Sequence, residues 1–129
     1  LITPNSQLIM DIEQFYEFCL AKKGVTEHFP FDEDTLVLKV GGKMFVLTSL
    51  KQWELGTPSL NLKCDPERAL ELRAEYECVE PGFHMSKVHW NTVTLNGDVG
   101  DKMVCAMIVD SYDLVFNSLT KKVREEMGE

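Results

Sequence analysis

The sequence predicts an α+β domain in which helices cover one face of a single antiparallel sheet. Apolar residues recur with a helical period in three segments, and short β-branched segments of alternating polarity lie between them. A Gly-Gly pair separates two of the short segments, which is typical of a tight hairpin. The expected order, α-β-β-β-α-β-β-α, packs into two layers. At 129 residues, the chain can form one such domain without a disulfide or a metal.

The first half of the chain is expected to form a helix, a hairpin and a third strand. An amphipathic helix is expected to begin at Asp11 and to be closed by Gly24. Its apolar residues share one face: Ile12, Phe15, Tyr16, Cys19 and Leu20. Strands are expected over 35–40 and 43–50, joined by Gly41-Gly42 in a type I′ turn, and a third strand over 59–64.

The register of this hairpin decides which side chains face the helices. A two-residue turn places Leu38 opposite Phe45 and Leu36 opposite Leu47, so these four are expected on the covered face. The open face then carries Thr35, Val37, Lys39, Met44, Val46 and Thr48. The same alternation in the third strand places three side chains on the open face: Ser59, Asn61 and Lys63.

The second half is expected to contain two helices and two more strands. Asp65 and Pro66 are typical of an N-cap and a first helical residue. Pro81-Gly82 breaks the chain, after which strands are expected over 83–85 and 89–95, with Trp90 on the open face. The longest helix is expected from Val104 to Leu119, followed by a short amphipathic tail over 120–127.

The net charge of −8 argues against a general nucleic-acid binder, because affinity for phosphate requires local positive potential. The charge is unevenly distributed, however. Residues 35–64 and 81–97 hold five lysines and one acid, Glu54. We therefore expect a mildly basic sheet and a strongly acidic helical layer. No apolar run approaches the roughly 20 residues of a membrane span, so no membrane contact is expected.

Cysteine usage and the first residues bear on location and domain bounds. The four cysteines form no C-x-x-C pair and follow no secretion signal, which favours reduced thiols in the cytoplasm. Met10 is typical of a natural start. Residues 1–9 are therefore expected to be an N-terminal extension, either a non-native remnant or an upstream segment, and residues 10–129 a single domain.

The segment 81–91, PGFHMSKVHWN, concentrates polar and aromatic side chains and has two interpretations. In a functional one, Trp90 stacks on a base or an aromatic ligand while His84, Lys87 and His89 meet phosphate or carboxylate. In a structural one, Trp90 and Phe83 close one end of the core. The usual burial of tryptophan favours the structural interpretation.

Catalytic and metal-binding patterns are absent from the sequence. His84, His89, Cys64 and Cys78 lack the spacing of metal ligands, and the acids at 32–34 are typical of a solvated loop. No nucleophile elbow or activated thiol is present. We therefore expect no catalytic residue, no metal and no cofactor, and a protein that is not an enzyme.

Five segments resemble the MmcQ/YjbR family of small bacterial proteins: VTEHFPF (25–31), TLVLKVGGKMF (35–45), LNLKCDPE (60–67), PGFHMSKVHWNTV (81–93) and SYDLV (111–115). The resemblance implies a two-layer α+β fold similar to secretion chaperones and DNA binding through a double-wing motif. It implies no catalytic or cofactor residues. The family's recurring polar positions correspond to Lys39, Lys43, Asn61, Lys63, His84, Lys87, His89, Trp90 and Asn91.

Three functions remain open at this point. In the first, the segments 36–47 and 83–95 act as wings on DNA, with binding that is weak and salt-sensitive because only four lysines meet phosphates: Lys39, Lys43, Lys63 and Lys87. In the second, the open face binds a protein or peptide through Val37, Met44, Val46 and Trp90, and the sheet edges accept a strand or a second copy. In the third and least favoured, a small ligand binds around His84, His89 and Trp90.

Overall fold

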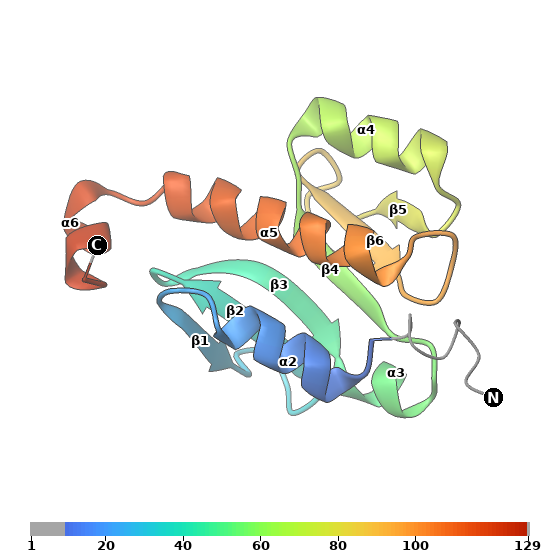
Figure 1. Ribbon diagram of the computed structural model, residues 1–129, viewed down its shortest axis with the longest axis horizontal. Coiled ribbons are helices and arrows are strands. Elements are labelled where there is room, and N and C mark those ends of the chain that lie inside the picture. The colour runs from blue at the N-terminus through green and yellow to red at the C-terminus, as the bar shows by residue number, and fades with distance from the viewer. Residues whose placement is uncertain (1–9, 129) are drawn as a thin grey trace.

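The computed structural model describes residues 10–128, which form one six-stranded antiparallel sheet with helices packed on one face (Figure 1). The predicted fold class is confirmed. The strands follow the order β1-β2-β3-β4-β6-β5 across the sheet. Their bounds are β1 Val25–His28, β2 Thr35–Val40, β3 Lys43–Ser49, β4 Ser59–Lys63, β5 Val79–Pro81 and β6 Trp90–Thr94. The expected extension, residues 1–9, lies outside the described residues.

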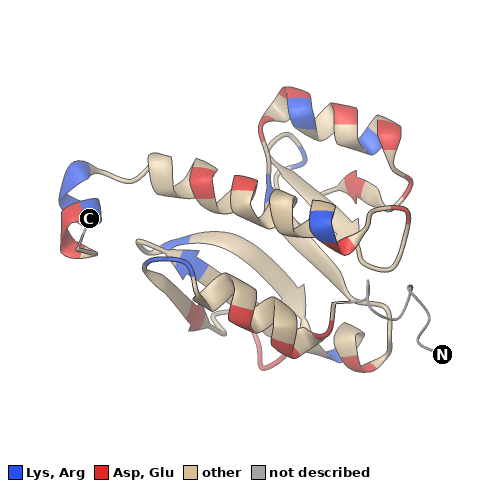
Figure 2. Ribbon diagram, in the orientation of Figure 1, with Lys and Arg blue, Asp and Glu red and all other residues tan. Residues whose placement is uncertain are grey.

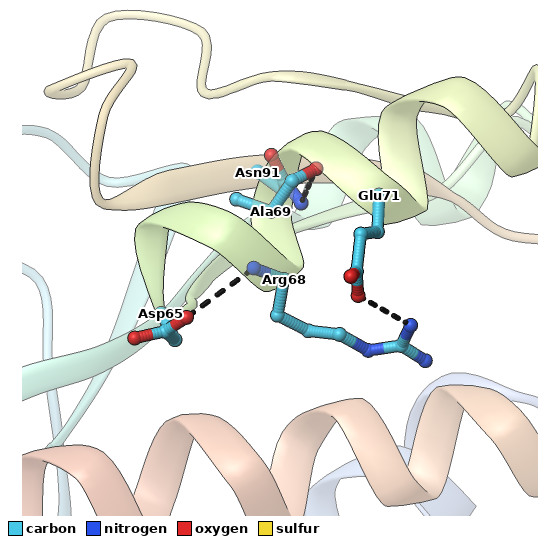
Figure 3. A network of polar contacts seen from close by, with 5 residues as sticks. All are labelled: Asp65, Arg68, Ala69, Glu71 and Asn91. Carbon is cyan, nitrogen blue, oxygen red and sulfur yellow. Dashed lines mark hydrogen bonds and ion pairs between the residues drawn. The ribbon is translucent and has the colours of Figure 1, made fainter.

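The helices begin where the sequence supplies caps. Their bounds are α2 Ile12–Leu20, α3 Leu50–Glu54, α4 Pro66–Glu75, α5 Asp101–Asn117 and α6 Lys121–Glu126. Asp11 and Gln14 form a capping box on α2, with 2.7 Å between the Gln14 nitrogen and Asp11 Oδ1. Asp65 caps α4 by accepting from the Arg68 N–H, and Pro66 is its first residue (Figure 3). No helix of the described chain is long and apolar enough to cross a membrane.

The main core lies between the helices and the covered face of the sheet. Phe15 of α2 and Ile108 of α5 are fully buried, as are Leu38, Phe45 and Leu60 from the strands. Burial of these side chains supplies the main free energy that joins the layers. The sequence predicted that Phe15, Leu38, Phe45 and Leu60 face the core. Ile108 was predicted only to belong to the apolar stripe of its helix.

The β2–β3 turn forms as predicted at Gly41-Gly42. Both glycines have positive φ, 59° and 82°, which glycine adopts without a Cβ penalty. Val40 pairs with Lys43, and Lys39 with Met44.

Beyond this turn, a β-bulge changes the predicted register. Leu38 pairs with Val46 instead of Phe45, so Phe45 is an extra residue in β3. From there on every side chain of β3 changes face: Val46 joins the main core and Leu47 lies on the open face. The predicted facings of Val46 and Leu47 were therefore wrong, because alternation alone does not reveal an inserted residue.

Several elements differ from the sequence prediction. The strand β1 and the short helix α3 were not predicted. β1 lacks the alternation of a predicted strand, because Val25 is its single apolar residue that packs on the core. As an edge strand it is held mainly by backbone pairing with β2. The strand expected over 83–85 is a loop, since His84 adopts φ 60° and the Phe83 N–H donates to the Thr92 side chain. Its place in the sheet is taken by β5, a few residues earlier.

Candidate functional site

The β2–β3 turn and the loop 82–89 lie at the same end of the sheet, which we call the turn end. Lys39 pairs with Met44 next to the turn, and Lys63 pairs with Trp90 next to the loop. Strands β3 and β4 connect the two pairs in register, with Val46 opposite Leu62. All four predicted phosphate-binding lysines therefore come to one end of the sheet.

These four lysines do not share one face. Lys39 and Lys63 are half-buried on the open side. Lys43 lies toward the helices, where its Nζ is 3.4 Å from the Ser118 hydroxyl oxygen. Lys87 donates to the Gly82 carbonyl at 2.8 Å, so its ammonium group already has a partner within its own loop. The four lysines therefore do not form one continuous patch on a single face.

Two further segments bring cations to the turn end, and the sequence analysis did not assign them to a site. A Cβ on Gly41 would stand 2.5 Å from Leu119, so the hairpin turn touches the chain that leads into α6. Lys23, after α2, donates to the Gly128 carbonyl beyond α6 at 2.9 Å. We define the basic end as Lys22, Lys23, Lys39, Lys43, Lys121, Lys122 and Arg124 (Figure 2).

The basic end gathers seven of the chain's 13 Lys and Arg residues. Lys22 lies over the Phe18 ring, 4.4 Å from its centroid, and Arg124 lies over Phe116. Glu125 and Glu126 share α6 with three of these cations, which reduces the local positive potential. The run of basic residues at 121–124 was the available sequence signal, but only tertiary contact reveals that it lies beside the hairpin.

Trp90 is buried, with 8% of its surface exposed, so its ring is not free to stack on a base or ligand as the functional interpretation requires. It packs on the open face with Val37 and Leu47, beneath the half-buried Met44 and Met85. The expected burial of Trp90 is therefore confirmed, but it packs in this small open-face cluster and not in the main core, and Phe83 is exposed. Val37 is also buried, so the predicted exposed patch on the open face is smaller than expected.

Asn91 is a structural residue. It is 2% exposed, and its amide donates to the Ala69 carbonyl of α4 at 3.4 Å (Figure 3). Its Oδ1 accepts from Arg73 Nε at 2.6 Å. Arg73, which the sequence analysis left out, also donates to the carbonyls of Lys87 and Trp90.

The two histidines of the motif do not converge. His84 and His89 are both exposed, and the His84 ring lies against Phe83 with 4.0 Å between centroids. The carbonyl of His89 accepts from the Cys64 N–H, whereas His84 lines a hollow on the open face. Trp90 is buried, and of these three residues only His84 lines the hollow. Within residues 10–128, no three His, Cys, Asp or Glu side chains gather as metal ligands.

The open face carries a hollow of about 990 Å³. Although apolar atoms form the larger share of its surface, six of the side chains that line it both donate and accept hydrogen bonds: Thr35, Ser49, Ser59, Asn61, Thr92 and Thr94. Phe31, from the loop before β2, and Phe83, from the loop after β5, also line it. Asn61 donates to the Phe83 carbonyl at 3.3 Å and accepts from the Thr92 hydroxyl, which fixes the loop carrying Phe83.

None of the four cysteines is activated. Burial raises the pKa of Cys19 to about 12. Burial and the hydrogen bond to Asp98 raise the pKa of Cys78 to about 11. The pKa values of Cys64 and Cys105 are raised by burial as well. All four thiols are protonated at neutral pH and are poor nucleophiles.

Comparisons with known proteins agree with the fold. The YjbR family model matches residues 20–114. The uncharacterized protein YbdF of Escherichia coli O157:H7 is 36% identical over 94 residues, which cover 73% of this chain and 75% of that protein. The uncharacterized protein YjbR of Escherichia coli K12 is 31% identical over 116 residues, which cover 90% of this chain and 96% of that protein.

Two solved structures are also similar. The crystal structure of Deinococcus radiodurans protein DR2400, with a DUF419 domain, is 37% identical with a TM-score of 0.85, covering 99% of this chain and 92% of that one. A crystal structure of a Pseudomonas syringae protein is 28% identical with a TM-score of 0.69, covering 82% of this chain and 99% of that one. The resemblance drawn from the five segments is thus confirmed along most of the chain, and the protein belongs to the YjbR family.

Proposed function

We propose that this protein is a non-enzymatic DNA-binding domain that contacts the phosphate backbone through its basic end. One observation carries the proposal: three separate segments, the turn after α2, the β2–β3 hairpin and α6, bring seven cations together in an acidic protein. Positive potential concentrated in this way attracts a polyanion even when the net charge is negative.

The remaining charge favours one orientation of the DNA. Acidic positions are spread along α2, α4 and α5, away from the hairpin turn (Figure 2). They repel phosphate and would keep the duplex at the turn end. The β2–β3 hairpin acts as the first wing. The second wing contributes less, because its loop 82–89 folds onto the open face and Lys87 is already bonded to the Gly82 carbonyl.

Binding is expected to be weak and sensitive to salt. Four to seven phosphate contacts correspond to a slope of log K against log salt between about −4 and −6 for duplex DNA. Glu125 and Glu126 on α6 keep the slope below that of a strongly basic domain. The expected slope distinguishes backbone contact from hydrophobic association, which salt does not weaken.

Fluorescence anisotropy with labelled duplex DNA, at several salt concentrations, tests the proposal. The double variant Lys121→Glu/Lys122→Glu is expected to lose about tenfold or more in affinity. Lys51→Glu/Lys102→Glu is the matched control, because it makes the same charge change in α3 and α5 away from the basic end. Lys87→Glu is expected to have a smaller effect than the α6 variant.

Two results would overturn the proposal. One is no binding at low salt with protein at about tens of micromolar, a concentration at which even non-specific binding is detected. The other is an equal loss in the α6 variant and its control, which would attribute any binding to net charge alone.

A further inference from the structure

The open-face hollow is separate from the basic end and has a different chemistry. It is lined by residues of five strands, from Thr35 in β2 to Glu80 in β5. Neighbouring strands lie about 4.8 Å apart, so the hollow runs about 19 Å across the sheet. An extended chain of about six residues spans that distance at about 3.3 Å per residue.

The polar part of the hollow's lining suits a polypeptide backbone. Hydroxyl and amide groups both donate and accept, as alternating N–H and C=O groups of an extended chain require. Ser59 and Thr94 pair directly across β4 and β6. In the described part of the chain, neither of their hydroxyl groups makes a hydrogen bond, and both residues line the hollow, so both hydroxyl groups are available to a ligand.

Two phenylalanines add apolar contact at the hollow. Phe31 is 64% exposed and Phe83 is 66% exposed, although both are large apolar side chains. They come from loops next to opposite parts of the sheet, one before β2 and one after β5. Exposed aromatic residues that line a concave surface are typical of a binding site, where they act as anchors.

The charged side chains that line the hollow determine which kind of polypeptide it can bind. Asp32 and Glu80 contribute two carboxylates, against one ammonium group from Lys87 that is bonded to the Gly82 carbonyl. Hydrogen bonds from Thr35 lower the pKa of Asp32, so this carboxylate remains ionised. Among residues 10–128, Glu80 forms no ion pair. The surplus of negative charge disfavours a phosphate backbone and favours Lys or Arg side chains.

From this geometry we infer that the hollow binds an extended segment of a partner protein that carries basic residues next to apolar ones. A second copy of this chain fits less well, because two concave faces would enclose an empty volume. The loop that carries Phe83 is already held by Asn61 and Thr92, so the site is formed before the partner arrives. Such pre-organisation lowers the entropic cost of binding.

Selection from a phage-displayed random peptide library on the full chain tests this inference. The enriched peptides are expected to combine Lys or Arg with apolar residues, and synthetic copies are then titrated by anisotropy. Phe83→Ser and Glu80→Lys are each expected to weaken binding about tenfold. Leu70→Ser on α4 and Glu71→Lys are matched controls outside the hollow, and both are expected to bind as the unchanged protein does.

Three outcomes would overturn the inference: no enriched peptide, enrichment of acidic peptides, or equal binding by the hollow variants and their controls. Sedimentation measurements add a fourth. A dimer that Phe83→Ser dissociates would identify a second copy as the occupant instead. Circular dichroism shows whether each variant is folded. DNA binding by the Glu80→Lys variant is measured in parallel with peptide binding. The two measurements distinguish a failure of this inference from a failure of the DNA-binding proposal.

Discussion

Arg73 of α4 donates a partly buried hydrogen bond to Asn91 of β6, with 2.6 Å between Nε and Oδ1. The same guanidinium group donates to the carbonyls of Lys87 and Trp90. One side chain of the helical layer therefore holds both the end of the loop 82–89 and the start of β6. The sequence singled out the polar residues of the segment 81–91 as candidates for binding. Some of them instead help to fix the loop 82–89.

Replacing Arg73 with methionine is expected to destabilise the fold by about 2–3 kcal/mol, because Asn91 Oδ1 stays buried without its charged donor. Chemical denaturation measures this loss, and hydrogen exchange over 82–89 is expected to become faster. Arg68→Met on the same helix is the control. Arg68 forms an exposed ion pair with Glu71 at 3.2 Å (Figure 3), worth less than about 1 kcal/mol. Equal losses in the two variants would contradict the role of Arg73.

Ser111 compensates for the β-bulge. Its buried hydroxyl donates to the Phe45 carbonyl at 2.6 Å and accepts from the Lys63 N–H at 2.9 Å. Ser111→Ala leaves both backbone groups without a partner and is expected to cost about 1–3 kcal/mol. Ser118→Ala, at the exposed end of α5, is expected to cost less. Thermal and chemical denaturation of both variants compare the two losses; a neutral Ser111→Ala would show that the bulge is stable without the hydroxyl.

Sequence reasoning succeeded where local chemistry determines the structure. Asp11, Asp65 and the Gly41-Gly42 turn each specify their element through a few neighbouring residues. It failed at Phe45, where the carbonyl at the bulge accepts from a hydroxyl of α5 that is distant in the sequence.

In the candidate site, too, local patterns were predictable and tertiary contacts were not. Parity placed Lys39, Asn61, Lys63 and Trp90 on the open face. The usual burial of tryptophan favoured a buried Trp90, but its position beneath Met85 could not be predicted, because residues 83–85 were expected to be a strand. The approach of α6 to the hairpin also depends on tertiary packing, so the basic end was not visible in segment charges.

The stability of the protein is expected to fall at alkaline pH because of Cys19. Burial raises the pKa of this thiol from 9.0 to about 12 in the folded state. Between these values the unfolded state releases a proton that the folded state retains, so stability is full below pH 9 and declines as pH rises. The decline is about 1 kcal/mol per pH unit. Urea denaturation from pH 8 to 11 measures it.

Cys19→Ala is the control for this prediction. The variant is less stable at every pH because it leaves a cavity, but its stability should decline less steeply above pH 9. An unchanged slope would assign the alkaline loss to other groups.

The contact between the hairpin turn and α6 predicts different effects for substitutions at two adjacent glycines. Gly41 and Gly42 both have positive φ, so alanine at either position is strained by about 1 kcal/mol. A Cβ on Gly41 would also stand 2.5 Å from Leu119 and 3.0 Å from Val123, whereas one on Gly42 meets no atom within 4 Å. Gly41→Ala is therefore expected to lose about 1 kcal/mol more than Gly42→Ala, to speed hydrogen exchange in α6, and to weaken DNA binding if the basic end is the contact surface. Denaturation, hydrogen exchange and anisotropy on the two variants measure these effects, and identical behaviour would mean that the hairpin and α6 are not packed together in solution.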